Sequence, residues 1–137
     1  MEKSALLEKI EALSVKESWK KKFRLYAEAG LKSGGIFLKF EHKEAIQGKI
    51  LANSNAFGFL FGILYYLYLG LYKKAGLFFL FYCVSSFLVG LIYSLTDGGV
   101  DLEGLDVGVT LLSLVYISMT VNYDHYRKKV LGENFWW

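Results

Sequence analysis

Apolar residues are spread unevenly along this chain of 137 residues, and the longest uncharged stretches lie in its second half. Residues 75–95 carry no charge, and as a helix they would be about 31 Å long, which matches the hydrocarbon core of a bilayer. Residues 107–123 form another uncharged stretch, about 25 Å long as a helix and sufficient for a short span. The pattern therefore predicts an all-α membrane protein with two transmembrane helices.

A further apolar stretch, residues 56–72, precedes these two and makes up the rest of a predicted membrane domain, residues 56–123. It is at the lower length limit for a span, and it contains three glycines and several tyrosines, which are typical of the headgroup level. The pattern leaves two interpretations open. The stretch is either a re-entrant or interfacial segment that stays on one side, or a third transmembrane helix.

Residues 1–55 are predicted to form a cytosolic helical region with an amphipathic lead-in to the membrane. Within it, "SVKE" at residues 14–17 is a capping box that predicts the start of a helix, and Gly30 is a natural stop for it. Trp19, Phe23 and Tyr26 share one face of this helix. Helices of this length are unstable alone in water. We therefore expect this face to pack within the domain or to be an interaction face for a partner.

The distribution of charge predicts the orientation in the membrane. Residues 1–55 contain eleven Lys or Arg against seven Asp or Glu, whereas residues 96–106 contain four acids and no base. Positive charge returns with Arg127, Lys128 and Lys129. Lysine and arginine favour the cytosolic side of a membrane. The acidic loop is therefore expected outside, with both termini in the cytosol and residues 124–137 as a cytosolic tail.

Lys73 and Lys74 are the only charged residues between residues 56 and 96, and they decide how residues 56–72 are interpreted. If residues 75–95 run outward and residues 107–123 return, these two lysines face the cytosol together with the N-terminus. Residues 56–72 then begin and end on the same side. The charge pattern favours the re-entrant interpretation over the third crossing.

Small residues recur at a spacing of four in the membrane domain. Gly58 and Gly62 form one such pair, and Ser86 and Gly90 form another. This spacing lets helices approach closely in lipid. Packing within the monomer is the simpler interpretation, and association into a homo-oligomer is the alternative.

The residues expected for catalysis or metal binding do not form a recognisable motif. His42 and His125 stand apart from each other, and Cys83 is the single cysteine. We therefore predict no catalytic, cofactor-binding or metal site, and no binding of nucleic acid. The absence of Asp, Glu, Lys, Arg and His within residues 75–95 and 107–123 also argues against a transporter that works alone.

Two segments of the chain resemble a known family. "SWKKKFRLYAEAG" at residues 18–30 and "NAFGFLFGILYYLYLGLYKKAGLFFL" at residues 55–80 resemble domain-of-unknown-function family 2628, over about residues 15–95. The matching positions are Trp19, Lys20 and Phe23 in the first segment, and Ala56, Phe57, Phe59, Phe61, Gly62, Tyr65, Tyr66, Tyr68, Lys73 and Lys74 in the second. Ile63 stands where the family often has proline, so a bend after Gly62 would depend on glycine alone. The resemblance implies a short, multi-pass protein of the bacterial inner membrane and brings no catalytic motif.

These observations together favour a non-enzymatic inner-membrane protein that acts through interactions with another protein or with the lipid bilayer. A membrane-anchored immunity protein that binds a toxin or phage factor is the alternative. A subunit of a channel or transporter is the third interpretation.

Overall fold

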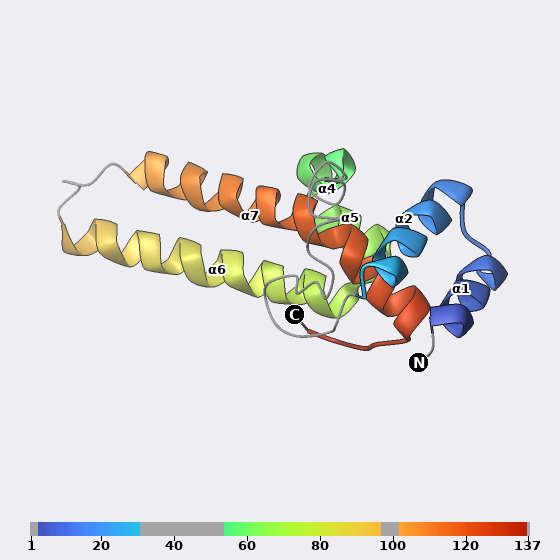
Figure 1. The fold of residues 1–137 in the computed structure, drawn as a ribbon. Coiled ribbons are helices and arrows are strands. Elements are labelled where there is room, and N and C mark those ends of the chain that lie inside the picture. The colour runs from blue at the N-terminus through green and yellow to red at the C-terminus, as the bar shows by residue number, and fades with distance from the viewer. Residues whose placement is uncertain (1–2, 31–53, 97–101, 137) are drawn as a thin grey trace. The chain divides into compact units, whose positions relative to one another are not determined.

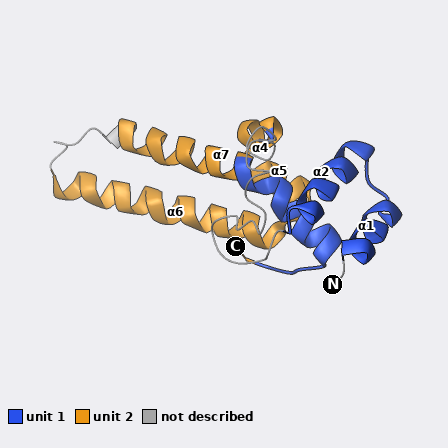
Figure 2. Ribbon diagram, in the orientation of Figure 1, with its two compact units in different colours: residues 1–55, 119–135, 137 blue, residues 56–118, 136 orange. Residues whose placement is uncertain are grey.

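The computed structural model describes residues 3–30, 54–96 and 102–136, and every regular element in these ranges is a helix (Figure 1). The chain divides into two compact units, shown in Figure 2. Unit 1 comprises residues 1–55, 119–135 and 137, and unit 2 comprises residues 56–118 and 136. The expected amphipathic lead-in, with His42, lies outside the described residues.

Unit 1 contains the two short helices expected near the N-terminus. They are α1 (Lys3–Ala12) and α2 (Glu17–Glu28), and they pack against each other. The backbone turns at Gly30, where φ is +60°, so the predicted stop is confirmed. The last part of α7 (Leu102–Tyr126) and the π-helix η1 (Arg127–Leu131) also belong to this unit. Unit 1 is therefore built from both ends of the chain.

The predicted capping box at residues 14–17 is wrong. Helix α2 begins at Glu17, and its N-cap is Lys16, which makes no side-chain cap hydrogen bond. The Glu17 carboxylate instead pairs with Arg24, at 3.1 Å. Val15 packs against the core of unit 1, so the chain between the two helices is held by an apolar contact.

Unit 2 contains α6 (Tyr72–Leu95) and the first part of α7, which run antiparallel beside each other (Figure 1). At 24 residues, α6 is about 36 Å long. Its side chains beyond Ala75 are mostly exposed and apolar. By length and composition both helices could cross a membrane, as predicted for residues 75–95 and 107–123. Helix α7 belongs to both units, because residues 119–126 are part of unit 1.

The stretch predicted as re-entrant or as a third span does not form one continuous helix. It contains two six-residue helices, α4 (Ala56–Phe61) and α5 (Ile63–Tyr68). Gly62 separates them, with φ +50° and ψ −121°, a conformation that residues with a Cβ rarely adopt. Gly70, at φ +73°, then turns the chain into α6. Glycine alone therefore makes both bends.

Candidate functional site

The aromatic face predicted on α2 forms the centre of the unit 1 core. The ring centres of Phe23 and Tyr126 are 5.7 Å apart, and those of Tyr26 and Tyr126 are 5.6 Å apart. Phe23 and Tyr26 are buried, and Trp19 is half-buried beside them. Ile10 of α1 is buried in the same core. The face expected to pack within the domain or on a partner is thus covered by the end of α7, within the chain itself.

His125 lies in this core, a position that no pattern in the sequence predicted. Its ring is 4.6 Å from Trp19 and 5.6 Å from Phe23, and the side chain is buried. Its Nδ1 atom has no hydrogen-bond partner among the described residues. The imidazole therefore serves mainly as a flat packing group between two aromatic rings.

Burial also changes the acidity of groups on α2. Tyr26 is removed from water, and the nearby carboxylate of Asp124 adds an unfavourable interaction with a tyrosinate. Both effects raise the pKa of Tyr26 above its ordinary value. Burial lowers the pKa of Lys22, whose ammonium group lies 5.2 Å from the centre of the Trp19 ring.

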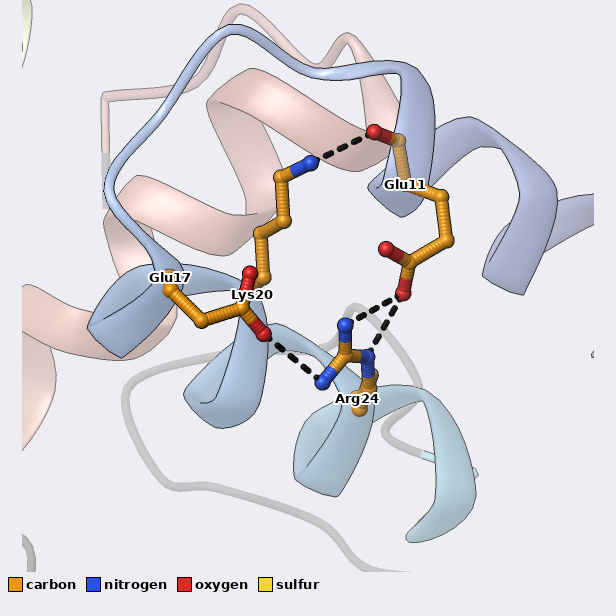
Figure 3. A network of polar contacts seen from close by, with 4 residues as sticks. All are labelled: Glu11, Glu17, Lys20 and Arg24. Carbon is orange, nitrogen blue, oxygen red and sulfur yellow. Dashed lines mark hydrogen bonds and ion pairs between the residues drawn. The ribbon is translucent and has the colours of Figure 1, made fainter.

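Charged side chains join α1 and α2 on the outside of unit 1 (Figure 3). The Arg24 guanidinium pairs with the Glu11 carboxylate at 2.6 Å and with the Glu17 carboxylate at 3.1 Å. Lys20 donates from its ammonium to the Glu11 backbone carbonyl at 2.6 Å. Such surface pairs each contribute little to stability, on the order of 0–1 kcal/mol. Their larger effect is to fix the pattern of charge on the unit's outer face.

Arg127, one of the predicted topology determinants, is largely buried at the start of η1. Its Nε donates to the Glu133 carboxylate at 2.7 Å, and its guanidinium lies 3.8 Å from the centre of the Phe135 ring. The chain returns toward Arg127 because Gly132, in the left-handed conformation, ends η1. Lys128 is half-exposed and Lys129 is exposed. The three basic residues therefore differ: Arg127 holds the C-terminal segment, and Lys129 faces solvent.

A buried polar contact links the residue before α4 to α7. The side-chain amide of Asn55 donates to the Asn122 side-chain oxygen at 2.7 Å, and the two residues are 5% and 1% exposed. Both residues belong to unit 1. The sequence did contain a signal for this contact. An asparagine in an apolar stretch is costly unless its side-chain amide finds a hydrogen-bond partner. A single sequence does not say which partner it finds.

Lys73 and Lys74, the other predicted topology determinants, have different environments at the start of α6. Lys74 is 4% exposed, and its ammonium lies 5.9 Å and 5.8 Å from the ring centres of Tyr66 and Tyr116. Lys73 is half-exposed, and its ammonium lies 5.5 Å from the Trp136 ring. Aromatic faces attract cations, and aromatic residues beside lysine are typical of the membrane–water interface.

The two pairs of small residues that were expected to pack helices differ in their surroundings. Gly58 and Gly62 are buried, and a Cβ added to Gly62 would lie 2.9 Å from the Leu114 side chain of α7. This pair therefore permits a close approach within unit 2. Ser86 is exposed, and a Cβ added to Gly90 would meet nothing within 4 Å. The second pair is not covered by any other described part of the chain.

In the described residues, the fold and these contacts define a helical protein with two helices apolar enough to cross a membrane and a helical unit built from both chain ends. A family described as "Protein of unknown function (DUF2628)" matches residues 8–130. The chain belongs to this family, and the match extends beyond the predicted residues 15–95 to include all of α7 and most of η1.

Two curated relatives are similar along nearly their whole length. Both are described as "Uncharacterized protein YigF", one from Salmonella typhimurium strain LT2 and one from Salmonella typhi. Each is 30% identical over 128 residues, which is 90% of this chain and 91% of the relative. No solved structure matches this chain.

Proposed function

We propose that this protein is a non-enzymatic, multi-pass protein of the bacterial inner membrane, and that unit 1 docks on a partner protein at the cytosolic surface. The observation that carries the proposal is the change along α7. In its first part α7 exposes apolar side chains such as Leu111, Leu112 and Val115, whereas Val121, Tyr123 and Tyr126 are buried in unit 1. One continuous helix thus connects a segment with exposed apolar side chains to a folded helical unit.

The contacts within unit 1 support placing both termini on one side of the membrane. Ile10 and Phe23 near the N-terminus share a core with Tyr126 and Val130 near the C-terminus. Residues that pack in one core lie on the same side. The excess of Lys and Arg in residues 1–55 favours the cytosolic side.

The docking surface is proposed to be the charged face of α2. The aromatic face of this helix is occupied by α7, so it is not free for a partner. Lys21 of α2 and Lys16, just before the helix, are exposed. The ion pairs of Arg24 hold the carboxylates of Glu11 and Glu17 in place nearby. A mixed pattern of fixed charges favours a specific protein partner, because such charges give selectivity and faster association.

The test has a membrane arm and a docking arm. The protein should stay with the membrane pellet at alkaline pH, and release into the supernatant would overturn the membrane assignment. A photo-crosslinking residue at Lys21 should give one discrete adduct in cells, and Lys16→Glu should abolish it. The same residue at Leu88 of α6, which is exposed to lipid in this proposal, is the control and should give no such adduct. Crosslinking at Lys21 only to lipid, or an adduct insensitive to Lys16→Glu, would overturn the protein-docking proposal.

A further inference from the structure

Residues 56–71 connect two contacts that lie close together along α7. Asn55, just before them, is hydrogen-bonded to Asn122, and Lys74, just after them, lies 5.8 Å from the ring of Tyr116. Tyr116 and Asn122 are six residues apart on one helix, which is about 9 Å along its axis. A segment that crossed the bilayer would separate its two ends by about 30 Å.

The middle of the segment reaches further along α7 than either end. Gly62, at the bend between α4 and α5, lies against Leu114, where a Cβ would be 2.9 Å from the leucine methyl group. Leu114 precedes Asn122 by eight residues, or about 12 Å of helix, and precedes Tyr116 by two residues, or about 3 Å. Both distances are well below the hydrocarbon core of about 30 Å. The chain thus follows α7 from Asn122 to Leu114 and reaches Lys74 near the level of Tyr116, so these contacts all lie within the depth of about one leaflet.

The outer surface of α4 and α5 is apolar and aromatic. Its most exposed large side chains include Leu60, at 71%, and Leu64, Phe57 and Phe61. The rings of Phe57 and Phe61 stack at 6.2 Å, and those of Tyr65 and Tyr68 stack at 6.0 Å. Residues 56–72 carry no charged side chain. In water such a surface would be a strong site for association.

We propose that residues 56–71 form a re-entrant hairpin that enters one lipid leaflet and returns to the side it started from, with its outer surface covered by acyl chains. The proposed occupant is lipid because the apolar surface of the hairpin continues onto its neighbours. Leu112 of α7 and Phe79 and Leu80 of α6 are exposed and apolar as well, and they lie close in sequence to Tyr116 and Phe78, whose rings are 5.9 Å apart. Irregular backbone within a membrane needs protein cover, and α7 supplies it at Gly62. The proposal rests on α6 and α7 crossing the membrane.

Cysteine labelling tests the path of the chain. Single cysteines replace Lys21, Lys73, Gly99 and Lys129 in a Cys83→Ala background, and intact spheroplasts are treated with a membrane-impermeant thiol reagent. We expect Lys21→Cys and Lys73→Cys to behave alike and to react only after the membrane is opened. Reaction of Lys73→Cys in intact spheroplasts, with Lys21→Cys protected, would overturn the hairpin and indicate a third crossing. Gly99→Cys and Lys129→Cys test separately whether α7 crosses the membrane. If it does, only one of these two cysteines reacts with the reagent in intact spheroplasts.

A spin label tests the lipid occupant. A nitroxide at Leu60→Cys, in the full chain reconstituted into phosphatidylethanolamine–phosphatidylglycerol vesicles, is exposed to oxygen or to a water-soluble nickel complex. We expect strong broadening by oxygen and little by nickel, as for a label at Leu80→Cys, with Lys21→Cys as the aqueous control. Strong broadening by nickel would place α4 in water. Protection from both agents would show protein, such as a second copy of the chain, over this face. Either outcome overturns the proposal.

Discussion

The side-chain amide of Asn55 donates a hydrogen bond to the side-chain oxygen of Asn122 at 2.7 Å, within unit 1. Asn122 stands where α7 changes from exposed apolar residues to buried polar ones such as Asp124 and His125. Asn55 immediately precedes α4. The contact therefore holds the entry to the α4–α5 segment at a defined position along α7.

Removing either partner of this contact should destabilise the protein, because the remaining buried amide loses an interaction that water cannot replace. Asn55→Ala and Asn122→Ala are each expected to lower the free energy of unfolding by about 1–3 kcal/mol. The double variant should lower the free energy of unfolding by less than the sum of the two single variants, because each single variant already removes the shared contact. Unfolding in detergent, followed by circular dichroism, measures all three. Asn134→Ala is the control because this residue is exposed. Additive costs would show that the two amides are not coupled.

Among the aromatic residues of unit 1, Phe23 should be the one whose substitution lowers the free energy of unfolding most. Its side chain is fully buried, between His125 and Tyr126. Phe23→Ala is expected to cost about 3–5 kcal/mol, because it removes a large buried ring and leaves a cavity. Phe23→Leu keeps most of the apolar volume and should cost clearly less. Equal unfolding midpoints for Phe23→Ala and the unchanged chain would contradict the described core.

The regular pattern of the sequence predicted the helices well where one physical cause dominated. Uncharged stretches of span length predicted α6 and the first part of α7, because length and hydropathy alone make a helix fit a bilayer. Trp19, Phe23 and Tyr26 were grouped correctly on one face, since their spacing of three to four residues is a local property of a helix.

The partners of these residues could not be predicted, because they depend on contacts distant in sequence. Nothing in the spacing on α2 indicates that Tyr126 completes its core, and Lys73 and Lys74 look equivalent until Tyr66 and Tyr116 are placed around Lys74. The capping-box prediction failed as well. Local chemistry favoured Ser14 as the cap, but the helix begins at Glu17, and Val15, next to Ser14, packs against the core of unit 1.

Gly62 should not tolerate a side chain, whereas Gly90 should. Gly62→Ala would place a Cβ 2.9 Å from Leu114 in a backbone conformation at φ +50°, and we expect a cost of about 1–3 kcal/mol. Gly90 is helical and faces open space, so Gly90→Ala should be neutral or stabilise by up to about 1 kcal/mol. Thermal unfolding in the same detergent compares the two variants. A harmless Gly62→Ala would argue against the bend between α4 and α5.

Arg127 should matter more to stability than Glu133, although the two form one ion pair. Arg127 also lies over the Phe135 ring at 3.8 Å, so its removal breaks a second contact. We expect Arg127→Ala to cost about 3 kcal/mol, close to the range for breaking a buried pair, and Glu133→Ala to cost less because Glu133 is partly exposed. Arg127→Lys keeps the charge but loses the planar group and should be intermediate. Limited proteolysis after residue 131 would report whether the C-terminal segment has detached.

Tyr26 should make unit 1 sensitive to alkaline pH. Its pKa is raised in the folded chain, mainly by burial and then by Asp124, so the folded state holds this proton more tightly than the unfolded state does. The stabilising effect is complete below the ordinary tyrosine pKa of about 10, and it is lost as the pH rises from there toward the folded pKa. The free energy of unfolding should therefore fall above about pH 10. Tyr26→Phe has no proton to lose at this position, and its stability should fall less steeply over the same range. Tyr72→Phe, at an exposed ring, should follow the unchanged chain. If Tyr26→Phe and the unchanged chain lose stability in parallel, the Tyr26 hydroxyl is not held in the buried environment described.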